Sequence, residues 1–352
     1  MVQSAPIEMV EVKMTSWRRW LLLADGFGIS AVSIYYALHD MKLAEVLKDL
    51  RGANYWWLIP GVAVYFVAVW ARTWRWHYLL RPIQRVPLHD LFPVVVIGYM
   101  GNNVYPLRAG EVIRAWVLKR NAGVSISASL ATIIVERIFD GLVMLLFVFA
   151  ALPFARIPPP YDQIVIWMTA LFVGALVAFF ALALRPEFSR RLYHAAFTKF
   201  VPVEDVRAWL VAVADRFMDG LSSLRSPADL AMTLVTSVVI WLTETTKYWF
   251  VMHAFNFEVS FFVLMLMTAV VNLATTLPSS PGYVGTFDLP GIAVLSAFGV
   301  DANVAAAYTL VLHAALWLPI TVLGVYYMIR QGIRWGDFAR ASSEIGSVGE
   351  AS

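Results

Sequence analysis

The chain has 352 residues, of which 60% are hydrophobic and only 14% are charged. A mean hydropathy of +0.69 lies far outside the range of soluble globular domains and indicates a membrane protein that crosses the bilayer several times. The net charge of +3 gives no support to a nucleic-acid partner, and the absence of cysteine excludes disulfides and thiolate catalysis.

Six apolar runs are long enough to span a bilayer, which takes about 20 residues. They lie at 20–38, 55–80, 126–152, 164–184, 230–255 and 303–329. Residues 1–19 lack the pattern of a cleavable signal peptide and are predicted to form a cytoplasmic tail. Residues 185–226 mix charged and apolar residues at helical spacing, which predicts an amphipathic insert on the cytoplasmic membrane face. Residues 331–352 are predicted to form a second cytoplasmic tail.

Two further apolar stretches are broken in the middle by polar residues. The first runs over 88–121, and its tip contains Asn102, Asn103, Pro106, Arg108 and Gly110. The second runs over 258–299 and breaks at LPSSPGYVGT, residues 277–286. Lipid cannot satisfy exposed backbone N–H and C=O groups, so such tips must be buried in protein or must line a water-filled cavity. Both stretches are therefore predicted to be re-entrant hairpins of broken helices.

The chain also repeats itself. The segment that starts at Gly123 aligns with the segment that starts at Gly299, and the segment at Trp70 aligns in position with that at Trp241. Repeat 1 covers about 20–152 and repeat 2 about 164–330. Each contains two spans, a broken hairpin and a third span, and an odd number of spans inverts the second repeat relative to the first. Inverted repeats with paired interrupted helices are typical of transporters that bind substrate at the membrane midplane.

The basic residues predict the orientation. With the N-terminus in the cytoplasm, only Lys42, Lys48, Arg51 and Arg156 of the 27 Lys and Arg face outside, as the positive-inside rule requires. We therefore expect an all-α polytopic protein of the plasma membrane, with six transmembrane helices, two re-entrant hairpins and both termini cytoplasmic.

Several motifs resemble a known family. They are GNNVYPLRAGEVIRAWVLKRNAGVSISASLATIIVERIFD from residue 101 and LPSSPGYVGTFD from residue 277. Their R-x-G-E-x-x-R, E-R-x-x-D and Pro-Gly-x-x-Gly-Thr elements are similar to those of the lysylphosphatidylglycerol synthase membrane-domain family, also called flippase-like, over about 20–330. In the synthases this part resembles a lipid flippase fused to a cytosolic aminoacyltransferase. The chain stops soon after its sixth span, so the resemblance implies a stand-alone member. Such members are linked to glycolipid pathways.

The hairpin tips suggest a site for an anionic head group. Each hairpin places a helix N-terminus at its deepest point, near Ala109–Glu111 and Thr286–Asp288, where free N–H groups and the helix dipole favour phosphate. Arginine adds forked donors that suit phosphate. Arg137 lies about 17 Å into its span at 1.5 Å per residue, and its counterpart in the other repeat is His313. The predicted substrate-binding residues are Arg108, Arg114, Arg137, Asn103, Glu111, Glu136, Asn272, Thr286 and His313.

Other interpretations of these residues stay open. Arg137 can pair with Asp140 in a purely structural role, and Glu244 with Lys247. Glu111 can cap its helix, balance the neighbouring arginines or act on substrate. A membrane-embedded transferase that uses Glu111 or Glu136 as a base is one alternative function. Another is a scaffold that recruits a cytosolic or membrane lipid-modifying transferase. The first expectation is flippase-like translocation of an anionic phospholipid or lipid-linked intermediate, with no cofactor and no metal.

Overall fold

The computed structural model describes residues 28, 31–35, 42–106, 108–154, 185–201, 204–220, 227–276 and 280–338, together with six isolated positions between 167 and 181. The described residues form helices joined by loops, with no strand among them. The predicted spans at 20–38 and 164–184 lie almost entirely outside the described residues, as do the tail 1–19 and residues 339–352. The helices are α2 (Leu43–Gly52), η1 (Tyr55–Trp57), α3 (Leu58–Leu80), α4 (Leu88–Val104), α5 (Ala109–Ala122), α6 (Ile126–Ala151), α8 (Pro186–Phe200), α9 (Glu204–Gly220), α10 (Pro227–Met252), α11 (Phe261–Ala274), η3 (Pro281–Tyr283), α12 (Asp288–Ala297) and α13 (Ala302–Arg330).

The helices fall into two sets with the same order of lengths. In the first set the long α3 is followed by the shorter pair α4 and α5 and by the long α6; in the second set α10, α11, α12 and α13 follow the same order. The caps correspond as well, because Ser125 caps α6 and Asp301 caps α13 through side-chain bonds to backbone N–H groups. The two sets therefore share the same order of long and short helices.

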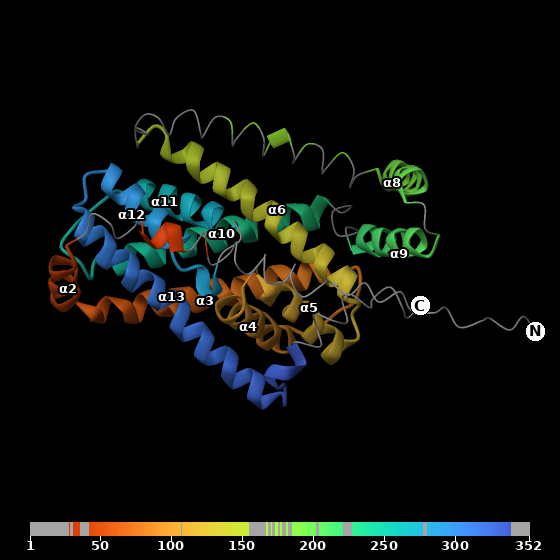
Figure 1. Ribbon diagram of the computed structural model, residues 1–352, viewed down its shortest axis with the longest axis horizontal. Coiled ribbons are helices and arrows are strands. Elements are labelled where there is room, and N and C mark those ends of the chain that lie inside the picture. The colour runs from red at the N-terminus through yellow and green to blue at the C-terminus, as the bar shows by residue number, and fades with distance from the viewer. Residues whose placement is uncertain are drawn as a thin grey trace, which may run out of the picture.

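The two sets exchange contacts with one another. α3 packs along α10 in antiparallel sense, since Gly61 lies against Val251 whereas Arg75 reaches Ser237. From the first hairpin α4 packs on α13 of the other set, and from the second hairpin α11 packs on α6. In Figure 1 α11 and α12 lie toward the end that carries α2, while α4 and α5 lie toward the end that carries α8 and α9. The two hairpins thus approach each other from opposite ends of the molecule.

The arms of the first hairpin are held close by glycine. A Cβ placed on Gly110 would lie 1.9 Å from the carbonyl oxygen of Gly98 and 2.5 Å from the backbone nitrogen of Asn102. Only glycine permits backbones to approach this closely, which is a common device between helices in membranes. This packing fixes the depth and angle of the tip at residues 104–108.

Within the described part of the chain, three helices are long and apolar enough to cross a membrane, over Tyr55–Leu80, Ala228–Met252 and Ala302–Arg330. α6 has 26 residues, about 39 Å at 1.5 Å per residue, and carries three ionisable side chains near its middle, Glu136, Arg137 and Asp140. The charges of α6 lie inside the protein: Glu136 and Asp140 are buried. A helix of this length with its charges turned inward can lie across a bilayer without exposing them to lipid.

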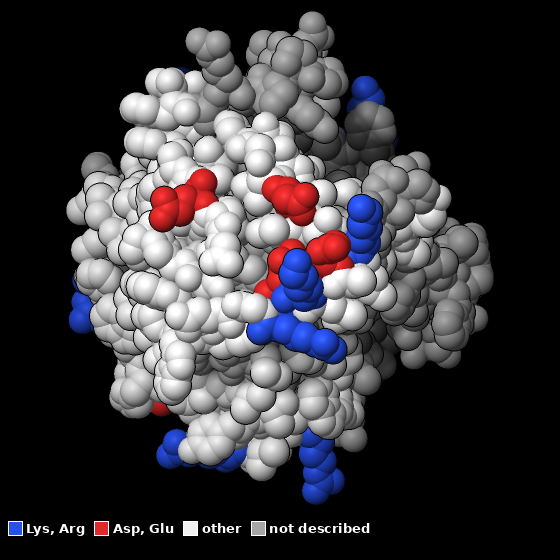
Figure 2. Space-filling model, turned by 90° about the vertical axis from the view of Figure 1, so that its left-hand side faces the viewer, with Lys and Arg blue, Asp and Glu red and all other residues white. Residues whose placement is uncertain are grey.

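The amphipathic insert forms α8 and α9. The two helices join through Tyr193, whose hydroxyl donates to Asp215, and α9 packs against α6, where Met218 enters the main hydrophobic core. Figure 1 places both helices at one end of the long axis, opposite α2. At the opposite end, which Figure 2 shows face on, charged side chains of both signs gather in a small area of an otherwise uncharged surface.

Candidate functional site

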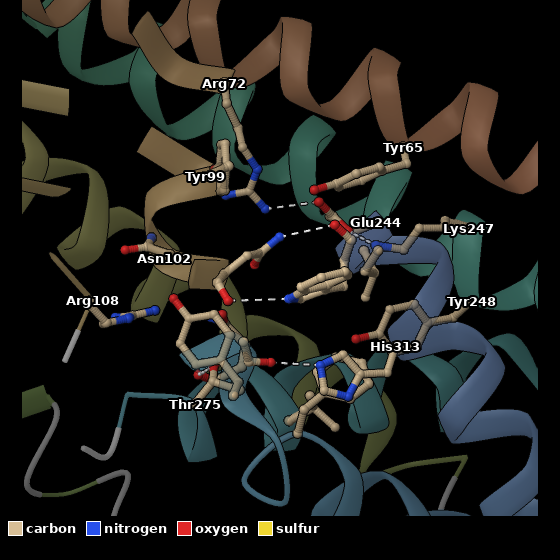
Figure 3. Close-up of a pocket in the computed structure, with 18 of the residues that line it drawn as sticks. Tyr65, Arg72, Tyr99, Asn102, Arg108, Glu244, Lys247, Tyr248, Thr275 and His313 are labelled. Carbon is tan, nitrogen blue, oxygen red and sulfur yellow. Dashed lines mark hydrogen bonds and ion pairs between the residues drawn. The ribbon is translucent and has the colours of Figure 1, made fainter. Parts of the chain in front are cut away.

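A cavity of about 150 Å³ lies where the two hairpins meet. This volume is several times the roughly 30 Å³ that one water occupies in the liquid, so the cavity has room for a small charged group. Its walls come from both sets of helices. They are Tyr65 and Arg72 of α3, Tyr99, Asn102 and Asn103 of α4, Arg108, Arg137 of α6, four residues of α10 (Trp241, Glu244, Lys247, Tyr248), six residues of the second hairpin (Val271, Asn272, Thr275, Gly282, Tyr283, Phe287), and His313, Leu316 and Trp317 of α13 (Figure 3).

The two hairpin tips touch at the cavity through residues with strained backbone. Arg108 and Tyr283 are the only non-glycine residues with positive φ in the described chain, at 55° and 61°. The Arg108 guanidinium carbon lies 5.8 Å from the centre of the Tyr283 ring, a cation–π distance. Strained backbone of this kind persists only where the surroundings enforce it, and it gathers at functional positions. The tips are therefore joined to each other at the wall of the cavity.

Trp317 joins both tips to α13. Its indole N–H donates to the carbonyl oxygen of Asn103 at 3.3 Å, and the Asn103 amide donates to the carbonyl of Trp317 at 3.2 Å and to Thr321 Oγ1 at 2.8 Å. A Cβ on Gly282 would come within 2.8 Å of the Trp317 indole nitrogen, so the second tip packs against the same ring. Trp317 lines the cavity and is 36% exposed, so part of its ring lies at the surface of the protein.

Positive charge dominates the cavity wall. Four permanent cations line it, against a single carboxylate, Glu244, among the described lining residues: the cations are Arg72, Arg108, Arg137 and Lys247. Inside a protein the attraction between opposite charges is several times stronger than in water. The wall is therefore suited to an anionic ligand.

Glu244 lies between two of these cations. Arg72 Nη2 approaches Glu244 Oε1 at 3.2 Å, and Lys247 Nζ pairs with Glu244 Oε2. Figure 3 shows Arg72 and Lys247 reaching Glu244 from opposite sides. All three side chains are buried, with Lys247 only 1% exposed. The pairing of Glu244 with Lys247 expected from their spacing is confirmed, and Arg72 is added to it.

A second ionic cluster lies behind the wall. Arg75 Nη1 donates to Asp140 Oδ1 at 2.6 Å, and the Trp241 indole donates to the same oxygen at 2.9 Å. Arg114 donates to Glu136 through both terminal nitrogens and stacks 3.5 Å above the Trp76 ring. The buried charges of this cluster are neutralised by one another, as buried charges must be, while the Nε atoms of Arg75 and Arg114 have no hydrogen-bond partner among the described residues. The cluster holds α3, α5, α6 and α10 together.

Arg137 connects the second cluster with the cavity. Its Nε lies 3.0 Å from Glu111 Oε1, and its Nη1 lies 3.2 Å from Asp140 Oδ2. The structural pairing with Asp140 is therefore present, yet Arg137 also lines the cavity and keeps a quarter of its side chain exposed. Glu111 lies close to Arg108 as well as to Arg137, since Arg108 Nη1 is 4.0 Å from the same oxygen. One carboxylate is thus shared by two arginines.

His313 fastens the second hairpin to α13. Its Nδ1 lies 2.9 Å from Asp288 Oδ1 and its Nε2 lies 2.7 Å from the carbonyl oxygen of Gly282. Both ring nitrogens face acceptors, so both bonds form only when both nitrogens carry hydrogen, as in the imidazolium ion. Asp288 also accepts from the backbone N–H of Gly285 at 2.9 Å. A charged His313 paired with Asp288 would hold the tip of this hairpin in place.

Comparison with known proteins identifies the family. The model described as the lysylphosphatidylglycerol synthase TM region matches residues 23–324. The chain belongs to this family. It is 25% identical over 314 residues to a UPF0104 membrane protein of Methanothermobacter thermautotrophicus, and the alignment covers 86% of this chain and 91% of the relative. It is 26% identical to the glycosyltransferase AglD of Haloferax volcanii, over 86% of this chain and 52% of AglD. It is also 22% identical to the UPF0104 membrane protein PH1989 of Pyrococcus horikoshii, over 87% of this chain and 95% of the relative. No solved structure matches it.

Five of the nine residues predicted to bind substrate line the cavity together: Asn103, Arg108, Arg137, Asn272 and His313. Four others do not. Arg114 and Glu136 are paired with each other, Glu111 lies behind Arg108 and Arg137, and Thr286 Oγ1 bonds the carbonyl of Tyr283. The half-helix starts predicted near residues 109 and 288 agree with α5 and α12.

The lysylphosphatidylglycerol synthase TM motifs do not include several residues of the wall. Arg72, Tyr65 and Tyr99 were not expected there, and Glu244 and Lys247 were expected only as a pair. The signal that could have identified Arg72 and Glu244 as wall residues lay in the Trp70 and Trp241 segments, which align in position. They place an arginine of one repeat opposite a carboxylate of the other once the two helices run antiparallel.

Proposed function

We propose that the protein is a flippase-like translocator of an anionic phospholipid or lipid-linked intermediate. The head group binds in the cavity between the two hairpin tips while the hydrocarbon chains remain in the bilayer. The observation that carries this proposal is the wall itself, where four permanent cations face one carboxylate. Its partly exposed edge at Trp317 gives a head group a route in from the side of the bundle.

The proposal includes a membrane arrangement. Six spans and two re-entrant hairpins form an inverted repeat, with α4–α5 entering from the cytoplasm and α11–α12 from outside. The described basic residues near the helix ends support this orientation. At one end Lys42 precedes α2, and Lys48 and Arg51 lie within it. At the other end Arg81 and Arg85 follow α3, Lys119 and Arg120 lie in the last turn of α5, and Arg330 and Arg334 lie at and after the end of α13. That asymmetry matches the positive-inside rule for a protein of the plasma membrane.

The roles of individual residues follow from their positions. Arg108 and Arg137 contact the head group, since both line the cavity and each keeps about a quarter of its side chain exposed. Asn103 holds the first tip against α13, and Asn272 lies at the end of the second hairpin's first arm. The cavity arginines Arg108 and Arg137 are held in position by residues that do not contact the lipid. These are Arg114, Glu136 and Glu111.

Leaflet exchange tests the proposal. Purified protein is reconstituted into liposomes with a fluorescent phosphatidylglycerol or phosphatidylcholine, and exchange is followed by quenching of the outer leaflet. We expect exchange of the anionic lipid, and Arg108→Ala should slow it at least about tenfold, since a charge-assisted hydrogen bond contributes about 1.5–3 kcal/mol. The matched control is Arg85→Ala, which removes an exposed arginine outside the cavity. Equal exchange in wild type, Arg108→Ala and empty liposomes would contradict the proposal.

A second candidate follows from the match to AglD. That relative is named a glycosyltransferase, and this chain covers 52% of its length. A membrane module that presents a lipid carrier to a separate lipid-modifying transferase would use the same cavity. Co-purification of a transferase activity that is lost in Arg108→Ala, without leaflet exchange by the purified protein, would favour this candidate.

A further inference from the structure

We infer that Glu244 takes up a proton when an anionic head group enters the cavity, so that anion binding by this protein is linked to proton movement. The inference rests on the proposed function and adds that a proton is bound and released together with the anion. It arises from the position of Glu244 as the single carboxylate among the described lining residues.

Two of the four cations that line the cavity are already engaged by Glu244. Arg72 Nη2 is 3.2 Å from Glu244 Oε1, and Lys247 pairs with the other oxygen of the same carboxylate. No second carboxylate is recorded within ion-pair distance of Lys247 in the described chain, and Arg72 has only Asp140 besides, at 4.0 Å. An anion that moves inward from Arg108 must therefore share Arg72 and Lys247 with Glu244.

Two negative charges cannot share these cations without strong repulsion. The side chains of Arg72, Glu244 and Lys247 are at most 8% exposed, so water does little to screen them. When two acidic groups occupy one buried site, protonation of one of them removes the repulsion. A protonated Glu244 can also donate a hydrogen bond to the anion that displaced it, which a carboxylate cannot do.

The neighbouring titratable groups leave Glu244 as the acceptor. It is faced by Tyr65 and Arg72 from α3, Tyr99 from α4, Arg137 and Asp140 from α6, and Lys247 and Tyr248 from α10. Asp140 keeps its contacts to Arg75, which lies behind the wall, and to the indole of Trp241, which is itself part of the wall. Asp288 keeps His313, and Glu136 keeps Arg114. Glu111 also shares its cations with the cavity, but 23% of its side chain is exposed.

The exchange is reversible. When the anion leaves, Glu244 regains Arg72 and Lys247 and releases its proton, which restores the paired state seen in the structure. A proton gradient would then bias the direction of anion movement without any nucleotide. The balance is simple: one carboxylate and one proton give one carboxylic acid on entry, and the reverse occurs on exit.

Calorimetry in two buffers tests this directly. The purified full chain is titrated at neutral pH with dihexanoyl-phosphatidylglycerol in buffers of different ionisation enthalpy, and the difference in heat gives the protons taken up. We expect about one proton for each bound lipid in wild type. Glu244→Gln should bind the lipid more tightly, because a competing carboxylate is gone, and should take up no proton. Glu258→Gln, which changes an exposed carboxylate, should behave as wild type.

The outcomes separate the two proposals. Binding by wild type without proton uptake, or equal uptake by Glu244→Gln, overturns the role of Glu244 and leaves the proposed function standing. Absence of binding by wild type overturns both. Should Glu244→Gln fail to fold, the double variant Glu244→Gln/Lys247→Met restores the charge balance and must likewise bind without proton uptake. In liposomes, a pH gradient should speed leaflet exchange severalfold in wild type and leave the rate of that double variant unchanged.

Discussion

The arginines of this chain differ in how completely the protein uses their donors. Arg114 is buried, lies on the Trp76 ring and is paired with Glu136 through both terminal nitrogens. Arg108 has a carboxylate only at 4.0 Å, lies beside Tyr283 and keeps 23% of its side chain exposed. An arginine whose donors are already satisfied cannot bind a ligand without breaking its own contacts. Exposure and incomplete pairing thus identify the binding arginines better than the motif does.

The backbone of Arg108 gives a prediction at this scale. Because Arg108 has φ near 55°, the left-handed region that costs a residue with a Cβ about 1–2 kcal/mol, Arg108→Gly should be more stable than Arg108→Ala by about 1 kcal/mol. Both variants should lose anionic lipid exchange, since both lack the guanidinium. Thermal unfolding in detergent measures the first effect and leaflet exchange the second. Equal melting temperatures would show that the left-handed conformation carries no strain.

Residue spacing explains which site residues could be predicted. Arg108 precedes α5 as its N-cap in the left-handed conformation, whereas Arg114 lies within the helix, so the two side chains have different surroundings. Glu136 and Arg137 are adjacent and therefore about 100° apart, and only Arg137 faces the cavity. A motif gives the residue types, but the direction of each side chain depends on where its helix packs. Of the nine residues that the sequence predicted to bind substrate, five therefore line the cavity and four do not.

At the scale of helices, the broken hairpins were the strongest signal. Polar and proline residues inside apolar runs showed where α4–α5 and α11–α12 break, and the predicted starts near 109 and 288 agree with the structure. The contact between α3 and α10 was not predictable in the same way, because it joins residues more than 160 positions apart. Local patterns carry no information on such pairs. Arg72 entered the site through this contact, and it was missed for that reason.

The close approach within the first hairpin can be tested by one methyl group. Gly110→Ala places a Cβ where it would overlap Gly98 and Asn102, and it should lower stability by about 1–3 kcal/mol as other overpacked sites do. Gly336→Ala is the matched control, since a Cβ there meets nothing within 4 Å. Thermal unfolding in detergent would show the difference. Unchanged stability in both variants would mean that the hairpin arms can separate freely.

For the whole molecule, the two helix sets and the distribution of basic residues predict how the protein lies in the membrane. α2 and the Gly299–Asp301 turn lie at one end, where Lys42 N–H bonds the Asn303 side chain. The α5–α6 turn and the segment after α13 meet at the other end, where Arg120 and Asn121 contact Gln331. The same end carries most of the exposed arginine and lysine. The membrane spans at 20–38 and 164–184 remain predictions.

The absence of cysteine makes the orientation measurable. Lys48→Cys, at a position whose side chain is 80% exposed, should react with an impermeant maleimide in intact cells. Arg334→Cys, exposed at the opposite end, should react only after the membrane is opened. The unmodified chain, which has no cysteine, gives the background. Labelling of Arg334→Cys in intact cells would contradict the proposed topology and indicate the opposite orientation.

The buried ion pairs have a consequence for the order in which the chain enters the membrane. Glu136 and Asp140 of α6 find Arg114 and Arg75 within the first helix set, so these charges can be neutralised as soon as α6 emerges from the ribosome. Arg72 must wait for Glu244, which is synthesised 172 residues later. Until then Arg72 has only Asp140 as a carboxylate partner among the described residues, at 4.0 Å, and α10 supplies the closer Glu244. A truncated chain that ends before Glu244 is therefore expected to remain an incompletely inserted intermediate.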